Sequence, residues 1–349
     1  MQPVDIDPAA VATSGGRGPV PLRGNGTRFG FISHIVGDGN SAEILRDTIE
    51  LATVAEESGY DSFWVAQHHF GTQGGHCPSP LVLLAAIAQR TTRIRLGTAV
   101  VVGSLEDPIR LAEDAATVDA LSGGRLELGL GAGADEQTSH RFGRDHGQRH
   151  ERFADTLHRI RELLSVGSDL VPNTRGLRDR LWIGTSSEQG FALAADLDLG
   201  VLTGRTSSAQ GPRDEIAARR TDHYIAVQRQ HGRIPRVGVS RSVLCAGSRR
   251  DAFAAMRPGI DRWVASSICA GQFPADFTTA DYVRTGHCYL GTGPQIAEMV
   301  AADPMVPMAT EFLCNVQPAA PAAGDVRRSV RLFAEQFITE RGSADRRRA

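Results

Sequence analysis

The sequence predicts an α/β fold, a (β/α)8 barrel with an insertion between its seventh and eighth strands. Eight short apolar runs alternate with helical patterns, which is typical of parallel strands joined by crossover helices. The 349 residues, 41% of them hydrophobic, suffice for a barrel of about 250 residues with added loops. An open, doubly wound sheet would need a glycine-rich phosphate turn after the first strand, and Gly37-Asp38-Gly39-Asn40 does not supply it. Two smaller domains are a further alternative.

Residues 1–27 precede the regular pattern and are rich in Pro, Gly, Ala and Ser, so we expect a flexible leader there. The barrel domain is expected over residues 28–341, followed by a flexible tail at residues 342–349. Its strands are predicted at residues 28–33, 60–65, 94–102, 126–130, 181–184, 199–203, 236–245 and 309–316.

Helix signals follow these strands. Asn40 begins the first helix, while Ser79-Pro80 and Asp107-Pro108 each combine a capping residue with a first-turn proline. Ser248 begins the helix after the seventh strand. Residues 263–290 then break the pattern, and we predict an irregular insertion over the barrel mouth there. Its aromatic residues form either a lid or a small core of their own.

Composition restricts the possible partners. Lys plus Arg number 38 against 40 Asp plus Glu, a net charge of -2, which gives no electrostatic footprint for nucleic acid or an anionic membrane. The five cysteines include no C-x-x-C pair and are expected to be reduced thiols. No apolar run approaches the roughly 20 residues of a membrane span, and no signal-peptide pattern is present. We therefore expect a soluble, cytoplasmic protein that acts on small molecules.

Two histidines follow the second predicted strand. Residues 60–65 read as a strand buried on both faces, and Gln67, His68 and His69 leave its C-terminal end. In a parallel barrel this end carries the active site. The alternative is that one histidine caps the core and the other is solvated.

Two further segments at strand ends are candidates for binding. Gly129-Leu-Gly-Ala-Gly133 either allows a tight turn or leaves backbone N–H groups open to a phosphate or a ring edge. After the fifth strand, Ser186 or Ser187 can cap a helix whose first N–H groups, at Gln189 and Gly190, suit an anion.

Together these motifs resemble the bacterial luciferase-like flavin-dependent monooxygenases. The resemblance rests on Asp61 to Phe70, Gly97-Thr-Ala-Val-Val101, the segment from Pro108 to Arg125, and Gly129-x-Gly-x-Gly133, each at a strand end and in the right order. It covers residues 28–165 and continues more weakly through the Ser186 helix to the last helix.

The resemblance implies a barrel that binds reduced FMN at its C-terminal face and receives it from a separate flavin reductase. Oxygen then adds at the flavin C4a, and the resulting peroxide oxygenates a small organic substrate. His68 takes the place of the family's catalytic histidine. The bond between Ala99 and Val100 takes the place of the family's non-proline cis peptide beneath the flavin. Gly131, Ala132 and Gly133 would approach the cofactor, and Ser186 with the amides of Gln189 and Gly190 would bind its phosphate. A homodimer is expected.

The sequence departs from the family pattern at two places. Gln67 stands where a carboxylate commonly precedes the catalytic histidine, and Ala132 stands where the luciferases place an arginine. We predict that Arg205, just after the sixth strand, supplies the missing charge. A solvated loop arginine is the alternative.

Other readings stay open. His34, His76, His140 and His287 are candidates for the substrate side, and since no pair has metal-ligand spacing, we predict no metal site. A deazaflavin-dependent oxidoreductase shares the barrel and much of the motif set. A non-catalytic flavin-binding partner subunit is the third possibility.

Overall fold

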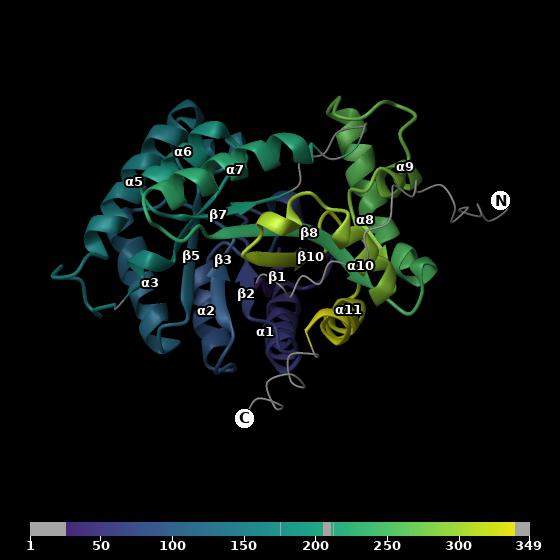
Figure 1. Cartoon of the computed structure of the whole chain (residues 1–349), viewed down its shortest axis with the longest axis horizontal. Coiled ribbons are helices and arrows are strands. Elements are labelled where there is room, and N and C mark those ends of the chain that lie inside the picture. Colours follow the sequence, from purple (N-terminus) through teal and green to yellow (C-terminus); the bar gives the residue numbers. More distant parts are fainter. Residues whose placement is uncertain (1–25, 175, 205–210, 212, 339–349) are drawn as a thin grey trace.

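Eight parallel strands form a closed barrel (Figure 1). The computed structural model describes residues 26–174, 176–204, 211 and 213–338. Around the barrel the strands follow the order β1, β2, β3, β5, β6, β7, β8 and β10, and β10 pairs with both β8 and β1 to close the ring. The predicted (β/α)8 barrel is confirmed.

The elements alternate along the chain almost as predicted. The strands are β1 Arg28–Ser33, β2 Ser62–Val65, β3 Arg95–Thr98, β4 Val101–Val102, β5 Leu126–Gly131, β6 Leu181–Gly184, β7 Gly200–Thr203, β8 Val237–Cys245, β9 Tyr289–Gly291 and β10 Glu311–Asn315. The helices are α1 Ser41–Glu57, α2 Pro80–Ala88, α3 Pro108–Leu121, α4 Glu136–Arg141, α5 Arg149–Leu163, α6 Glu188–Asp196, α7 Asp214–Gln230, α8 Arg249–Cys269, α9 Thr279–Arg284, α10 Gly293–Ala301 and α11 Ala323–Phe337. Short 3-10 turns lie at Thr72–Gly74, His146–Gln148, Arg178–Arg180 and Val306–Met308.

Local sequence explains most helix starts. The side chain of Asn40 accepts a hydrogen bond from the Ala42 amide, and that of Asp107 accepts from the amides of Ile109 and Arg110. Ser248 caps α8 in the same way. Ser79 makes no side-chain cap bond, so Pro80 at the first turn is the start signal that acts in α2.

Two apolar layers stabilise the barrel. The outer layer lies between the strands and the surrounding helices and includes one apolar face of α11, on which Val326, Val330, Phe333 and Phe337 are all buried. The inner layer fills the barrel and consists of Ile32, Trp64, Trp182, Leu202 and Leu313. Trp64 and Trp182 meet edge to face with ring centroids 5.6 Å apart. The barrel is therefore a packed core below its C-terminal mouth.

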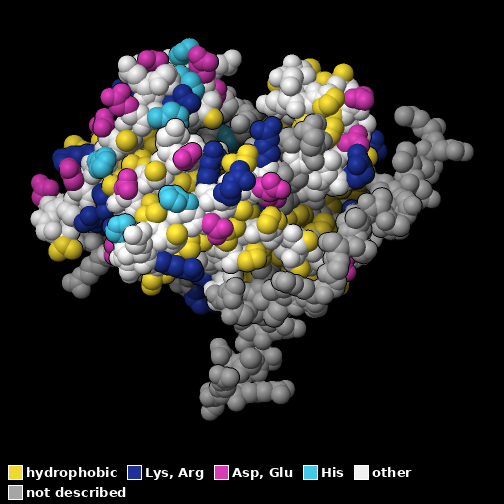
Figure 2. Space-filling view, turned by 45° about the horizontal axis from the view of Figure 1, so that its top comes forward, with side chains coloured by type: hydrophobic (Ala, Val, Ile, Leu, Met, Phe, Trp, Pro, Cys, Tyr) yellow, Lys and Arg dark blue, Asp and Glu magenta, His cyan; other side chains and the backbone are white. Residues whose placement is uncertain are grey.

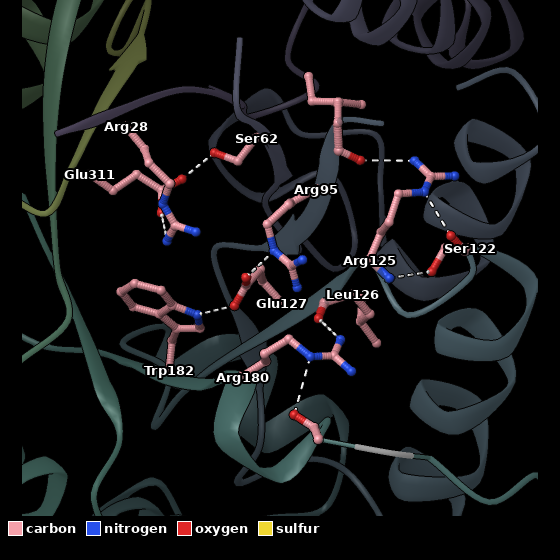
Figure 3. A network of polar contacts seen from close by, with 12 residues as sticks. Arg28, Ser62, Arg95, Ser122, Arg125, Leu126, Glu127, Arg180, Trp182 and Glu311 are labelled. Atoms are coloured by element: carbon pink, nitrogen blue, oxygen red, sulfur yellow. Dashed lines mark hydrogen bonds and ion pairs between the residues drawn. The ribbon is translucent and has the colours of Figure 1, made fainter. Parts of the chain in front are cut away.

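Charged side chains close the opposite end of the barrel (Figure 3). Arg28, Ser62 and Glu311 each occupy the first position of a strand, where Arg28 pairs with Glu311 at 2.9 Å and Ser62 donates to the same carboxylate. Arg95 pairs with Glu127, which also accepts from Trp182 Nε1 at 2.7 Å. Each buried carboxylate thus has an arginine partner, as low-dielectric surroundings require.

Arg125 explains part of the motif that ends α3. Its guanidinium donates to the backbone oxygens of Ala88, Thr91 and Ile94, and its Nε donates to Ser122 O at 2.7 Å. One side chain therefore satisfies several carbonyls at the end of α2 and in the turn to β3. This residue supports the fold at the strand starts, away from the mouth.

The structure corrects two predicted boundaries. The third strand does not run unbroken over residues 94–102, because Ala99 and Val100 separate β3 from β4. Residues 263–269 are not irregular, because α8 continues to Cys269. Beyond them, Phe273 and Tyr282 pack with Met256, Ile260 and other residues of α8 into a separate small core. Of the two alternatives for these aromatic residues, the small core is therefore present, and a lid role remains a prediction.

The helices α8 and α9 stand on the opposite side of the molecule from α5 and α6 (Figure 1). Between these two groups the surface is hollowed (Figure 2). Within the described residues no helix is long and apolar enough to cross a membrane. The predicted leader, apart from Gly26 and Thr27, and the predicted tail lie outside the described residues.

Candidate functional site

The C-terminal ends of five strands bring the predicted site residues together. His34 follows β1, His68 follows β2, and the Ala99–Val100 bond lies between β3 and β4. Gly131 ends β5 beside Val102, and Gly184 ends β6. A barrel places such positions around one mouth because all its strands point the same way.

His68 is held tightly by the segment that follows it. Its amide donates to Cys77 O at 2.9 Å, and a Cβ added at Gly75 would lie 2.4 Å from His68 Cγ, so only glycine fits there. The His68 Nε2 atom is buried and has no hydrogen-bond partner within the described residues. Burial lowers the pKa of His68, and neighbouring His69 lowers it further. The ring is therefore neutral at pH 7.

His34 forms the other half of a histidine pair. Its ring centroid lies 6.1 Å from that of His68. Burial, and then repulsion from His68, lowers the pKa of His34 to about 3. Two facing neutral imidazoles can accept or donate hydrogen bonds without adding charge to the mouth.

Like His68, His69 has a buried Nε2 with no hydrogen-bond partner among the described residues and a pKa lowered by burial, but its ring contacts differ. Its ring packs edge to face on Phe142, with centroids 4.8 Å apart, and touches Phe70. Arg141 lies 4.6 Å from the Phe70 ring centroid. These contacts tie the connection after β2 to the end of α4. The environment of His69 is therefore that of a packing residue.

A cavity of about 440 Å³ borders His68. Its lining residues are Ser41, His68, Phe70, Gly71, Gly74, Gly75, His76 and Pro78. His76 is not free in this wall, because its ring nitrogens lie 2.8 Å from Ser41 Oγ and 2.9 Å from Gly37 O. The volume suits a small molecule.

The predicted cis peptide between Ala99 and Val100 is present. The Val100 side chain reaches between β5 and β6, where a Cβ added at Gly131 or at Gly184 would lie 2.7 Å from one of its methyl groups. Ala99 and Val100 also pack on the inner apolar layer. Glycines at the two strand ends therefore leave the space that Val100 occupies, and Ala99 and Val100 form a wall at the mouth, here called the Val100 wall.

The glycine-rich end of β5 lies against the same wall. Gly133 has a positive φ of 78°, and a Cβ there would lie 2.5 Å from Val102 Cγ1. Ala132 O accepts from Ser104 Oγ at 2.8 Å. The glycines from Gly129 to Gly133 thus allow a tight turn, which was one of the two alternatives for this segment. Their contact with a cofactor remains a prediction.

Gln67 does not point into an open site. The residue is only 8% exposed, and both the Nε2 group and the Oε1 atom of its side chain bond to protein groups. All three of these hydrogen bonds join Gln67 to protein groups, and its predicted part in cofactor binding remains a prediction. Glu106, one of its partners, was not indicated by any sequence motif.

The predicted phosphate end is arranged differently in detail. Ser187, not Ser186, caps α6, and its Oγ accepts the Gly190 amide at 3.1 Å. The Gly190 amide, which was expected to bind an anion, therefore already donates to Ser187, and its contact with a phosphate remains a prediction. A Cβ at Gly190 would collide with Thr185, so glycine permits this close approach.

An arginine does lie at this helix start. Arg220, on α7, donates to Ser186 O. No sequence pattern pointed to it, since 34 residues separate the two positions. Arg205, the predicted replacement charge, lies outside the described residues. Arg220 is thus the described guanidinium that contacts Ser186.

Two of the histidines predicted for the substrate side, His140 and His287, lie away from His68 and the Val100 wall. His140 is exposed on α4 with Glu136 3.8 Å away, and His287 is buried against the Tyr282 ring. Within the described residues no group of three His, Cys, Asp or Glu side chains is placed to hold a metal ion.

Comparison with known proteins identifies relatives. Residues 27–302 match the family model for luciferase-like monooxygenase. The 4-hydroxyprotoasukamycin monooxygenase of Streptomyces nodosus subsp. asukaensis is 32% identical over 251 residues, 66% of either chain. An F420-dependent glucose-6-phosphate dehydrogenase of Amycolatopsis mediterranei is 39% identical over 124 residues, 34% of this chain and 37% of that one.

Two further relatives match over a shorter stretch, and one solved structure is more distant in sequence. The chain spans only 29% and 31% of two uncharacterised Sinorhizobium fredii proteins, at 43% and 41% identity. Among solved structures, the oxygenating constituent of 3,6-diketocamphane monooxygenase from Pseudomonas putida, in complex with FMN, has a TM-score of 0.71 at 18% identity, covering 90% of this chain and 99% of that one. At that identity the likeness concerns the fold.

Proposed function

The chain belongs to the luciferase-like monooxygenase family, and from this premise we propose that it is the oxygenase component of a two-component system. A separate flavin reductase delivers reduced FMN, and the chain uses it with O2 to oxygenate a small organic substrate. Support comes from the 4-hydroxyprotoasukamycin monooxygenase and from the diketocamphane oxygenating constituent, whose structure contains FMN.

The residues at the mouth fit a flavin. The flavin ring is proposed to lie against Ala99 and Val100, which are apolar and are seated beside Gly131 and Gly184. At the other end, Arg220 and the first turn of α6 offer positive charge for a phosphate. When bound, reduced FMN supplies the electrons that activate O2.

His68 is the proposed catalytic residue. The residue is half-buried, its Nε2 is buried and burial lowers its pKa, so the neutral ring can hold or pass a proton at a ring nitrogen with little access of water. The small cavity beside it is the proposed substrate side. The single observation that carries the proposal is that His68 and the Val100 wall both lie at the C-terminal ends of the barrel strands.

A deazaflavin-dependent oxidoreductase is the second candidate, favoured by the similarity to an F420-dependent dehydrogenase. Equilibrium dialysis under anaerobic conditions with FMN, reduced FMN, the deazaflavin and nicotinamide dinucleotides separates the candidates. We expect reduced FMN to bind most tightly. Tight binding of the deazaflavin without reduced FMN would select the second candidate, and nicotinamide binding alone would exclude both. A homodimer in the cytoplasm is also proposed, and sedimentation velocity tests the dimer.

A further inference from the structure

The Gln67 side chain joins three separate segments. Its Nε2 donates to Pro78 O at 2.9 Å and to Glu106 Oε1 at 3.0 Å, and its Oε1 accepts the Val102 amide at 2.6 Å. These partners belong to the end of the connection after β2, the turn before α3, and β4. One buried amide therefore holds all three segments.

Only an amide satisfies this set of partners. Pro78 O and the Glu106 carboxylate both require a donor, whereas the Val102 amide requires an acceptor. A reversed amide would place oxygen against two acceptors, so the orientation is determined by the partners. A carboxylate at position 67 would satisfy Val102 alone and would face the charge of Glu106.

The segment held by Gln67 continues into the Val100 wall. Val102 lies two residues after Val100, and β4 pairs with the end of β5 through Val102 and Gly131. The turn that follows is fastened on the β5 side as well, because Gly103 N donates to Gly131 O at 2.9 Å and Ser104 donates to Ala132 O. Gln67 supplies the corresponding contacts on the β2 side. The position of Val100 between Gly131 and Gly184 therefore depends on both.

We propose that Gln67, with Glu106 as its partner, is a positioning residue that sets the Val100 wall and thereby the affinity of the mouth for a flavin ring. It acts through Val102 without touching the cofactor. The inference rests on the proposed flavin-binding function. It also accounts for an amide at the position where a carboxylate was expected, since Glu106 supplies the carboxylate of this cluster.

The test is Gln67→Glu, which keeps the shape and changes one donor group. The titratable groups around position 67 are Glu106, His68, His69 and Cys77, and burial raises the pKa of the Cys77 thiol to about 11. Burial and Glu106 should raise the pKa of the new carboxyl. Relative to wild type at the same pH, FMN affinity should fall roughly tenfold at pH 8.5, the size expected for one unmade buried hydrogen bond. At pH 6.5 the protonated carboxyl donates again, and most of the loss should disappear.

Thermal unfolding of the same variant shows whether it folds. Because the folded-state pKa of the new carboxyl is raised, its stability should be lower at pH 8.5 than at pH 6.5 relative to wild type. Glu106→Gln added to Gln67→Glu should restore part of the FMN affinity at pH 8.5, because one donor again faces one acceptor. Gln73→Glu, an exposed site in the same connection, is the matched control and should change neither quantity.

Three outcomes would overturn the inference. The first is an FMN affinity of Gln67→Glu that equals that of the wild type at both pH values. The second is a loss of FMN affinity that neither low pH nor Glu106→Gln relieves. The third is a change in thermal unfolding with no change in FMN affinity, which would make Gln67 merely structural. Wild-type binding is measured first. If the wild type binds no flavin, the proposed function fails. If the wild type and Gln67→Glu bind flavin equally well, only the proposed role of Gln67 fails.

Discussion

The imidazole rings of His34 and His68 face each other at the ends of neighbouring strands, with centroids 6.1 Å apart and planes tilted by 40°. A proton on either ring would repel a proton on the other, in surroundings where burial already disfavours charge. The barrel mouth therefore keeps both histidines neutral near pH 7.

Acid should destabilise the protein through His34. Its pKa is about 3 in the folded state and near 6.5 when unfolded, so between these values the unfolded chain binds the extra proton. The free energy of unfolding should fall as pH drops from 6.5 toward 3, by up to about 1.4 kcal/mol per pH unit from this residue. Urea unfolding of wild type and His34→Gln at pH 7 and 4.5 measures the difference. Identical pH dependence in both proteins would contradict the assignment.

His68→Ala should separate binding from chemistry. The ring contributes little to the apolar core, so FMN affinity should change less than about twofold, whereas product formation should fall at least about tenfold as proton control is lost. Stopped-flow mixing of the reduced, flavin-loaded protein with oxygen should show faster hydrogen peroxide release. His69→Ala is the control, and loss of its contact with Phe142 should lower the free energy of unfolding by about 1 kcal/mol. Rapid peroxide release in His69→Ala but not in His68→Ala would reverse the two roles.

The phosphate partner can be found with two ligands that differ only in that group. Arg220→Ala and Arg205→Ala are made as two separate variants. The variant that lacks the arginine in contact with the phosphate should bind FMN more weakly by about 1.5–3 kcal/mol, while its riboflavin affinity stays the same. Isothermal titration with both ligands gives the comparison. Arg219→Ala, next to Arg220 on α7, controls for general charge. Equal losses for FMN and riboflavin would show that the arginine concerned does not touch phosphate.

Filling the space beneath Val100 should damage the mouth. A Cβ at Gly184 would lie 2.7 Å from Val100 Cγ1, so Gly184→Ala should displace Val100 and weaken FMN binding roughly tenfold, with about 1–3 kcal/mol lost from folding. Gly204→Ala is the matched control at the end of a neighbouring strand, because none of the residues that the structure describes lies within 4 Å of its Cβ. Fluorescence titration measures the affinity. Adding Val100→Ala to Gly184→Ala should relieve the strain, and failure to do so would mean that Val100 is not the group displaced.

Some parts of this protein follow from local sequence alone. The strands at residues 28–33 and 181–184 and the caps at Asn40 and Asp107 depend on neighbouring residues, and each was predictable from apolar runs and capping side chains. His68 was also predictable, because any residue directly after a barrel strand must lie at the mouth. The break of the third strand at Ala99 and Val100 was missed as a boundary, since its residues are as apolar as those of a strand.

The partnerships across the mouth were decided by the tertiary structure. Gln67 and Glu106 are 39 residues apart, and Ser186 and Arg220 are 34 residues apart, so no local pattern links them. Closure of the barrel places them in contact, and buried polar groups then take whichever partner completes their hydrogen bonds. The chain by itself therefore determined the fold and the place of His68 at the mouth, whereas the packing of strand ends decided that Gln67 bonds to Glu106 and that Arg220 contacts Ser186.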